Sequence, residues 1–153
     1  MNNDVTFTMI KPGAVNHEFI GPILTMINDA GFKIIAMRFT KLTIEEAEAF
    51  YSMHRDKHFF GELVKFITSA PVVAMILQKE NAVADYRRLI GDTDPSKAAP
   101  GTIRALYAED IEHNAVHGSD TDENARRECD FFFSMRERYA DYPVIHTIKR
   151  RSV

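Results

Sequence analysis

Apolar and polar positions near the start of the chain predict two strands with a helix between them. Apolar side chains alternate with threonines over residues 5–9, so we expect a strand that ends at Lys11. Apolar residues at helical spacing over 20–27 predict an amphipathic helix that stops at Gly31. The apolar and branched stretch 32–39 predicts the second strand.

The middle of the chain predicts three helices around one buried strand. Residues 43–46 are Thr-Ile-Glu-Glu, a capping box that opens a short helix to about Tyr51, and helical spacing predicts another helix over 60–67. A loop, 54–58, separates them. The unbroken apolar run 72–77 predicts a strand covered on both faces at the centre of the sheet. A third helix is expected from its N-cap, Asn81, to Gly91, with Arg87 in its last turn.

The last third of the chain has a less regular pattern. Residues 92–101 contain two prolines and predict a loop, and 108–119 show no clear period but carry reactive side chains. A helix-like stretch, 120–127, precedes the aromatic segment 129–133, which predicts the final strand. The order β-α-β-(helices)-β-α-(loop)-β favours an α+β domain, an antiparallel sheet with helices packed on one face.

Composition narrows the class of protein. A chain of 153 residues, 45% of them hydrophobic, predicts a single domain over 1–153 with a real core. The sequence shows no apolar run of membrane-spanning length and no signal-peptide pattern at its start, so we expect a cytoplasmic protein without a membrane partner. The single cysteine, Cys129, is expected in the core. A net charge of -3 argues against a dedicated nucleic-acid site, and the basic cluster at 149–151 is expected to be solvated.

His117 is the candidate nucleophile. It is followed by Gly118, which would let the backbone turn tightly, and by Ser119 and Asp120. A neutral imidazole can carry a phosphoryl group if its opposite nitrogen is held by a hydrogen bond, and Glu128 is a candidate for that role. A lone histidine is more often structural, so the other residues must decide.

Three cations could converge on the polyphosphate of a nucleotide. Lys11 is expected at a strand end, Arg87 at a helix end, and Arg104 after a Pro-Gly-Thr-Ile segment. Spacing along the chain does not demonstrate convergence, and an isolated arginine is more often a solvated surface charge. The sequence lacks both Gly-x-x-x-x-Gly-Lys-Ser/Thr and Gly-x-Gly-x-x-Gly, so any nucleotide would be held by side chains.

A metal site is a weaker alternative for the histidines. His54 and His58, and likewise His113 and His117, are spaced four apart and could share a helix face. No third set of ligands follows, and the chain has one cysteine. The sequence therefore gives little support to structural zinc.

Five segments, in order, resemble the nucleoside diphosphate kinase family, and the resemblance runs over about residues 5–134. The segments are Thr8-Met9-Ile10-Lys11-Pro12-Gly13-Ala14-Val15, Phe50-Tyr51 with His54, Phe59-Phe60, Pro100-Gly101-Thr102-Ile103-Arg104, and Asn114-Ala115-Val116-His117-Gly118-Ser119-Asp120.

The resemblance implies a ferredoxin-like fold and a ping-pong kinase. The fold would be a four-stranded antiparallel sheet of order βαββαβ with helices covering the faces. A nucleoside triphosphate would phosphorylate His117, and a nucleoside diphosphate would accept the group, with broad base and sugar tolerance. Glu128 and Ser119 would orient or assist the histidine, and Tyr51 would lie near the transferred phosphate.

The resemblance also implies how the nucleotide is held. Lys11 and Asn114 would contact the sugar hydroxyl region, with Lys11 also near the γ-phosphate. The phosphates would be held by Arg87, Thr93 and Arg104, and the base would lie between Phe59 and Ile111. Magnesium (Mg2+) is expected, bound mainly by the nucleotide phosphates and water. The family forms tetramers and hexamers, so a homo-oligomer is expected.

Two other classes of protein remain possible on sequence. The fold could bind nucleotides or nucleic acid without turnover, although every expected catalytic position is present. A histidine phosphocarrier would need a protein donor, whereas the expected base and phosphate contacts point to free nucleotides. The chain departs from many relatives at His113 and in the tail after Ser134, which affects expectations about assembly rather than chemistry.

Overall fold

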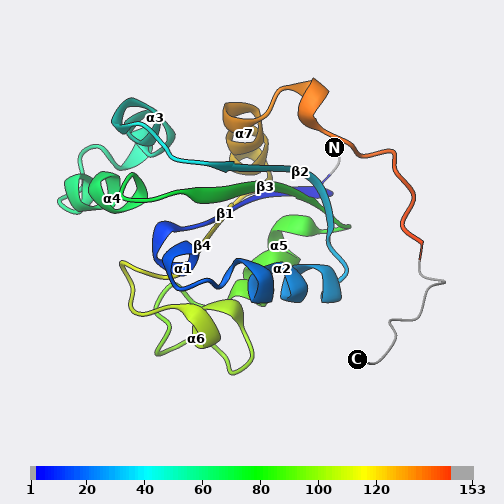
Figure 1. Cartoon of the computed structure of the whole chain (residues 1–153), viewed down its shortest axis with the longest axis horizontal. Helices are drawn as coiled ribbons and strands as arrows, with labels where there is room; N and C mark the ends of the chain where they lie inside the picture. Colours follow the sequence, from blue (N-terminus) through cyan, green and yellow to red (C-terminus); the bar gives the residue numbers. More distant parts are fainter. Residues whose placement is uncertain (1–2, 146–153) are drawn as a thin grey trace.

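The structure, a computed structural model, describes residues 3–145, and its strands form one antiparallel sheet (Figure 1). The strands are β1 (Val5–Ile10), β2 (Lys33–Thr40), β3 (Val72–Gln78) and β4 (Val116–Gly118), in the order β2-β3-β1-β4. Every neighbouring pair is antiparallel. The predicted α+β class with a four-stranded antiparallel sheet is therefore confirmed, with β3 at the centre as expected.

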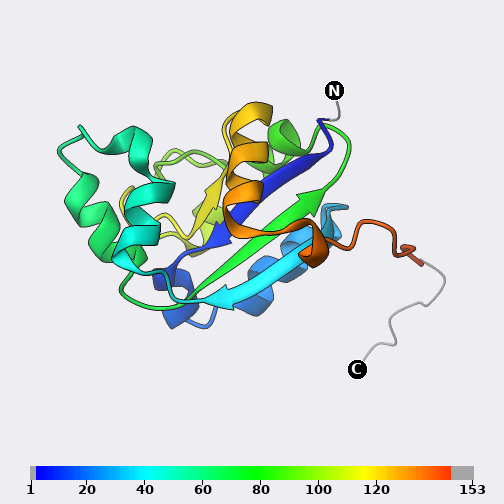
Figure 2. The same ribbon diagram turned by 90° about the horizontal axis from the view of Figure 1, so that it is seen from above.

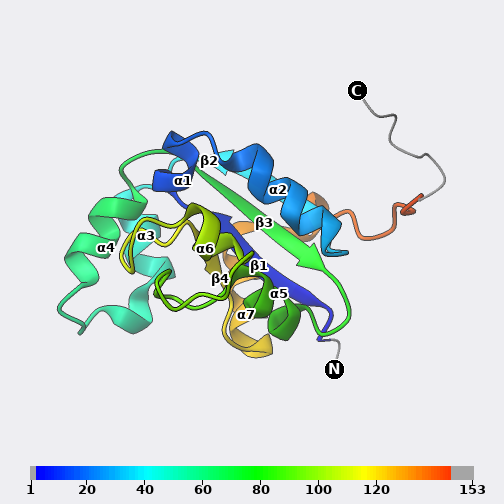
Figure 3. The ribbon, with the colours of Figure 1, turned by 90° about the horizontal axis from the view of Figure 1, so that it is seen from below.

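Helices cover both faces of the sheet, as the family resemblance implies, so the expectation of helices on one face only, drawn from the order of the elements, is wrong. Figure 3 shows one face covered by α1 (Pro12–Asn16), α2 (Ile20–Asp29), α5 (Ala82–Ile90) and α6 (Ile103–Tyr107). Residues of α3 (Ile44–Phe50), α4 (Phe60–Ile67) and α7 (Asp122–Phe132) belong to the core cluster of the opposite face. The continuous apolar run of β3 is the sequence signal for this arrangement, because both faces of that strand are buried.

The predicted final strand over 129–133 is also wrong. Helix α7 continues to Phe132, and the fourth strand is the short β4. Ala125, Glu128, Cys129 and Phe132 are buried at helical spacing, whereas Phe131 is 39% exposed, so the segment has one inward helical face. His117 consequently lies in a strand at the edge of the sheet. Cys129 lies in the core, as predicted.

The predicted helices up to and including α5 are confirmed, with one difference at Asn81. Thr43 and Glu46 form both hydrogen bonds of the predicted capping box at the start of α3. Asn81 precedes α5, but it has a φ of 54° and its side chain makes no cap bond. Its Oδ1 instead accepts a hydrogen bond from Asn3. The first residue of the predicted loop 54–58 is the last residue of a short 3-10 helix, Ser52–His54.

The segment after α7 runs beside the edge strand β2 (Figure 2). The amide of Tyr139 donates to the carbonyl oxygen of Ile35 at 2.7 Å, and Lys33 Nζ donates to the carbonyl oxygens of Ala140 and Tyr142. The basic cluster at 149–151 lies outside the described residues. Among residues 3–145, no helix has both the length and the apolar character needed to cross a membrane.

Candidate active site

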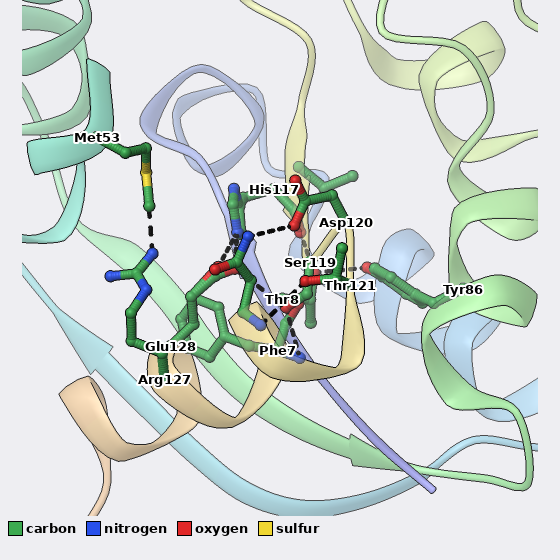
Figure 4. Close-up of polar contacts among 12 residues, drawn as sticks. Phe7, Thr8, Met53, Tyr86, His117, Ser119, Asp120, Thr121, Arg127 and Glu128 are labelled. Atoms are coloured by element: carbon green, nitrogen blue, oxygen red, sulfur yellow. Dashed lines mark hydrogen bonds and ion pairs between the residues drawn. The ribbon is translucent and has the colours of Figure 1, made fainter. Parts of the chain in front are cut away.

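The imidazole of His117 is held by a buried carboxylate. Its Nε2 lies 2.8 Å and 2.9 Å from the two side-chain oxygens of Glu128 (Figure 4). Strand β4 supplies the histidine and α7 supplies the glutamate, whose side chain is 4% exposed against 19% for His117. An ionised carboxylate only accepts hydrogen bonds, so Nε2 carries the proton. The lone pair of the imidazole is then on Nδ1.

Ser119 fixes the carboxylate of Glu128 from the other side. Its Oγ donates to Glu128 Oε1 at 3.1 Å and accepts from the amide of Phe7 at 3.3 Å. Ser119 is almost completely buried. The His117-Glu128-Ser119 chain of contacts therefore has little freedom to rearrange.

Aromatic rings enclose the imidazole. The centroids of Phe7, Phe50 and Tyr51 lie 5.8, 5.4 and 6.3 Å from the centroid of the His117 ring. The hydroxyl of Tyr51 is buried and has no hydrogen-bond partner among the described residues. Burial, and then the charge of Glu128, raise the pKa of Tyr51, so it stays a neutral donor. An unpaired buried hydroxyl is suited to an oxygen of a bound ligand.

Lys11 lies at the end of β1, as predicted, and is almost fully buried. Its Nζ donates to Asn114 Oδ1 at 2.7 Å. Burial, and then the charge of Arg104, lower the pKa of Lys11 to about 7. A bound anion would relieve both effects, because it would favour the charged ammonium group.

Arg104 is buried rather than solvated. Its Nη1 donates to the carbonyl oxygen of Gly91 and its Nη2 to that of Val116, both at 3.0 Å. Its Nε is buried without a partner among the described residues. Burial is the main cause that lowers the pKa of Arg104. The side chain therefore connects the loop after α5 to β4 and also borders the site.

Two backbone features place His117. Ala115 has a φ of 72°, and the amide of Val116 donates to the carbonyl of Asn114 across it, which forms a strained three-residue turn. Gly118 does not make the tight turn expected from sequence, because it lies in β4. A Cβ there would come within 2.8 Å of Ile90 Cδ1, so a larger residue would displace the Ile90 side chain of α5.

One cavity of about 910 Å³ brings the predicted site residues together. Of the eleven residues predicted, ten line it, and Ser119 lies behind Glu128 instead. The ten are Lys11, Tyr51, Phe59, Arg87, Thr93, Arg104, Ile111, Asn114, His117 and Glu128. The convergence that spacing alone did not establish is thus present in the structure.

We call the buried part of the cavity lining, which includes Lys11, Asn114 and Glu128, the inner end, and we call its exposed part the outer end. Phe59 is 38% and Ile111 55% exposed at the outer end, and Arg87 and Thr93 are also exposed. His113 is not on a helix face with His117. Its ring packs edge-on against Phe66, and its Nδ1 lies 3.0 Å from Asp110 Oδ1.

Sequence reasoning missed the residues that support the imidazole. Phe7 and Phe50 pack against it, and neither was among the predicted site residues. Their signal was only an apolar position in a strand and in a helix, which does not distinguish a core residue from one that borders a site.

Comparison with known proteins gives one consistent family. The family model for nucleoside diphosphate kinase matches residues 4–138. A nucleoside diphosphate kinase of Flavobacterium psychrophilum is 53% identical over 139 residues, which are 91% of this chain and 100% of that protein. One of Chlorobaculum tepidum is 54% identical over 132 residues, 86% of this chain and 94% of that protein.

Solved structures give the same result. The nucleoside diphosphate kinase of Aquifex aeolicus has a TM-score of 0.86 and 40% identity, and the match covers 88% of this chain and 98% of that one. The Halobacterium salinarum enzyme in complex with CDP has a TM-score of 0.87 and 40% identity, with 92% of this chain and 93% of that one covered.

Proposed function

Because this chain belongs to the nucleoside diphosphate kinase family, we propose that it transfers the γ-phosphoryl group between nucleotides in two steps, through a covalent phosphate on His117. The protein is a phosphotransferase that acts on nucleotides. The observation that supports the two-step route is the contact of His117 Nε2 with both oxygens of Glu128, which leaves Nδ1 as the nucleophilic atom.

In the first step the Nδ1 lone pair forms a bond to the γ-phosphorus of a nucleoside triphosphate. The bond from that phosphorus to the β,γ-bridging oxygen breaks, and the oxygen leaves with the electron pair on the nucleoside diphosphate. The ring gains positive charge, which the carboxylate of Glu128 stabilises through Nε2–H. In the second step a different nucleoside diphosphate attacks the phosphohistidine, so the same contacts serve in reverse.

The cations along the cavity would hold the phosphates. The buried Lys11 and Arg104 and the exposed Arg87 and Thr93 all line the same cavity. Each charge-assisted hydrogen bond to a phosphate oxygen contributes about 1.5 to 3 kcal/mol. Tyr51 could donate its unpaired hydroxyl to the transferred group.

Broad substrate use is part of the proposal. Phe59 and Ile111 offer apolar surface at the exposed rim, where a base would stack without base-specific hydrogen bonds. Asn114 and Lys11, which already contact each other, would reach the sugar hydroxyls. Recognition would then depend on the parts common to all nucleotides.

The site is compatible with a magnesium ion that arrives on the nucleotide. Asp120 lines the cavity, and a hydrogen bond from Asn124 is the main cause that lowers its pKa, so its carboxylate is ionised at neutral pH. Magnesium prefers oxygen ligands and keeps several waters. The phosphates and water would therefore be its main ligands, with Asp120 available to a bound water, and the ion would neutralise charge on the phosphate oxygens.

A homo-oligomer, a tetramer or hexamer, is also proposed. Met37 and Phe39 are 50% and 63% exposed on the edge strand β2, an apolar surface suited to a second copy of the chain. The molar mass in solution tests this. A cytoplasmic location stays a prediction.

The experiment for the proposed route is a rapid quench after mixing the protein with ATP labelled in the γ-phosphate. We expect one acid-labile, base-stable phosphate per chain, which GDP then removes as labelled GTP. The substitution His117→Ala should abolish uptake while nucleotide affinity changes only a few fold, because the phosphate-binding groups remain. Transfer without a labelled protein intermediate, or full activity in His117→Ala, would exclude the mechanism.

A further inference from the structure

Two buried hydroxyl groups form consecutive hydrogen bonds that end at the backbone carbonyl of His117. Thr8 on β1 and Tyr86 on α5 are both fully buried. Their hydroxyl oxygens are 2.6 Å apart, and Thr8 Oγ1 lies 2.8 Å from the carbonyl oxygen of His117 (Figure 4). Neither residue is among those that line the cavity.

The direction of these hydrogen bonds follows from the number of protons. A carbonyl oxygen only accepts, so Thr8 donates its single hydroxyl proton to His117. The hydroxyl of Tyr86 must then donate to Thr8 Oγ1. Burial raises the pKa of Tyr86, so the phenol keeps the proton it needs for this role.

Thr8 and Tyr86, together with Ile90, also pack closely against β4. The register pairs Thr8 with Gly118, directly after His117. A Cβ on Gly118 would lie 3.3 Å from Tyr86 Cδ2 and 2.8 Å from Ile90 Cδ1, so α5 packs directly on the strand. Tyr86 thus acts on β4 in two ways, by its ring, which packs at Gly118, and through Thr8, which donates to the carbonyl oxygen of His117.

We propose that Tyr86 and Thr8 are positioning residues for phosphoryl transfer, which act in series through the His117 carbonyl to set where the imidazole presents Nδ1. The inference rests on the proposed role of His117. Glu128 fixes one end of the imidazole, whereas the hydrogen bonds from Tyr86 to Thr8 and from Thr8 to His117, which we call the relay, fix the backbone from which the ring projects. Helix α5 also carries Arg87, which follows Tyr86 in sequence and lines the cavity. One helix would therefore connect phosphate binding to the position of the nucleophile.

The relay has a matched control on the same strand. Thr6 is also fully buried on β1, but its hydroxyl has no hydrogen-bond partner among the described residues. Thr6→Val and Thr8→Val therefore make the same change of atoms in similar surroundings. Only Thr8→Val removes a hydrogen bond to His117.

The test is single-turnover labelling of His117, with nucleotide affinity and unfolding free energy measured for each variant. We expect Thr8→Val to slow labelling by about five- to tenfold relative to Thr6→Val, with affinity within about twofold. Thr8→Ser should restore the rate. Tyr86→Phe keeps the ring and should slow labelling by about two- to threefold, because Thr8 can still donate.

A double-substitution cycle distinguishes a relay from two independent effects. In a Thr8→Val background, Tyr86→Phe should have no further effect on the rate. Equal labelling rates for Thr8→Val and Thr6→Val would overturn the proposal, as would an undiminished effect of Tyr86→Phe in the double variant. If Thr8→Val does not fold, a Tyr86→Phe rate equal to wild type overturns it. Absence of label on the wild-type protein would instead refute the proposed function.

Discussion

The inner and outer ends of the cavity differ in how completely their side chains are held before any nucleotide binds. At the inner end, His117 contacts Glu128, Glu128 contacts Ser119, and Lys11 contacts Asn114. At the outer end, Phe59 is more than one-third exposed. The inner end is therefore preorganised, and the outer end can adapt to its ligand.

The difference matches the separate demands of phosphoryl transfer and of base recognition. Phosphoryl transfer depends on placement of the nucleophile, where an error of about 1 Å can reduce the rate about 10²-fold. Stacking of a base on an aromatic face tolerates changes of base, since every base has a π-face. Rigid chemistry and tolerant recognition can thus occupy one cavity, and substitutions at each end should have different kinetic signatures.

The largest expected effect is at the inner end, from Glu128→Gln. The change keeps the size of the side chain but removes the charge that would stabilise the phosphorylated ring in the proposed route, so kcat should fall by about 10²-fold. Nucleotide affinity should change little, because Glu128 is committed to His117 and Ser119. Single-turnover labelling and equilibrium binding measure the two quantities. Glu123→Gln makes the same change at an exposed position of α7 and should be silent. A large loss of affinity in Glu128→Gln would contradict the separation of the two ends.

The second expected effect is a difference in stability and kinetics between substitutions of two arginines that line the same cavity. Arg104→Met should lower the unfolding free energy by about 2 kcal/mol and also slow transfer, because one buried and one partly buried carbonyl group lose their donor. Arg87→Met removes an exposed guanidinium, so it should raise KM with little change in stability. Urea unfolding and steady-state kinetics on both variants test the contrast. Equal stability losses would show that burial of Arg104 has no structural consequence.

The third effect is the change of stability and of nucleotide affinity with pH that the ionisation of Lys11 causes. Its pKa is about 7 in the folded protein and 10.5 ordinarily, so between these values the unfolded chain binds more protons. The contribution of Lys11 to stability therefore rises with pH over this window in the nucleotide-free protein. Bound phosphate favours the charged form, so binding above pH 7 should take up a proton, and affinity should fall by up to about tenfold per pH unit.

Calorimetry in two buffers of different ionisation enthalpy measures this proton uptake directly. The experiment should span about pH 7 to 8.5, below the range in which ordinary lysines titrate. Lys11→Met keeps a long apolar side chain and should remove the uptake and the slope. The same slope in Lys11→Met would assign the titration to another group.

How much of the fold was predictable depended on the length and regularity of each pattern. Strand β1 and helices α2 and α5 follow periodic apolar positions and β3 follows an unbroken apolar run, each over six to ten residues, and the sequence predicted all of them. Strand β4 has only three residues, which is too short for a period. Helix α7 was divided in two because Phe131, Phe132 and Phe133 favour a strand locally, whereas their tertiary contacts decide for a helix up to Phe132.

The sequence predicted residues that share one cavity, but it did not predict how deeply each is buried. The resemblance supplied residues that the cavity brings together, because a family motif records side chains that act jointly. It does not record that Arg104 is held by two backbone carbonyls, or that the side chain of Ile90 packs directly against Gly118. Those facts depend on contacts between segments distant in sequence, which no local pattern contains.

The smallest expected effect is at the outer end, from Phe59→Leu. Leucine keeps apolar contact but loses the aromatic face, and the site is partly open to water, so KM should rise by about threefold while kcat stays unchanged. The rise should be similar for adenine, guanine and pyrimidine nucleotides, since stacking does not read hydrogen-bonding groups. Steady-state kinetics with four diphosphate acceptors measures this, with Tyr139→Leu as an exposed aromatic control outside the cavity. A rise confined to one base would mean that the rim selects nucleotides, and a fall in kcat would mean that the two ends of the cavity are coupled.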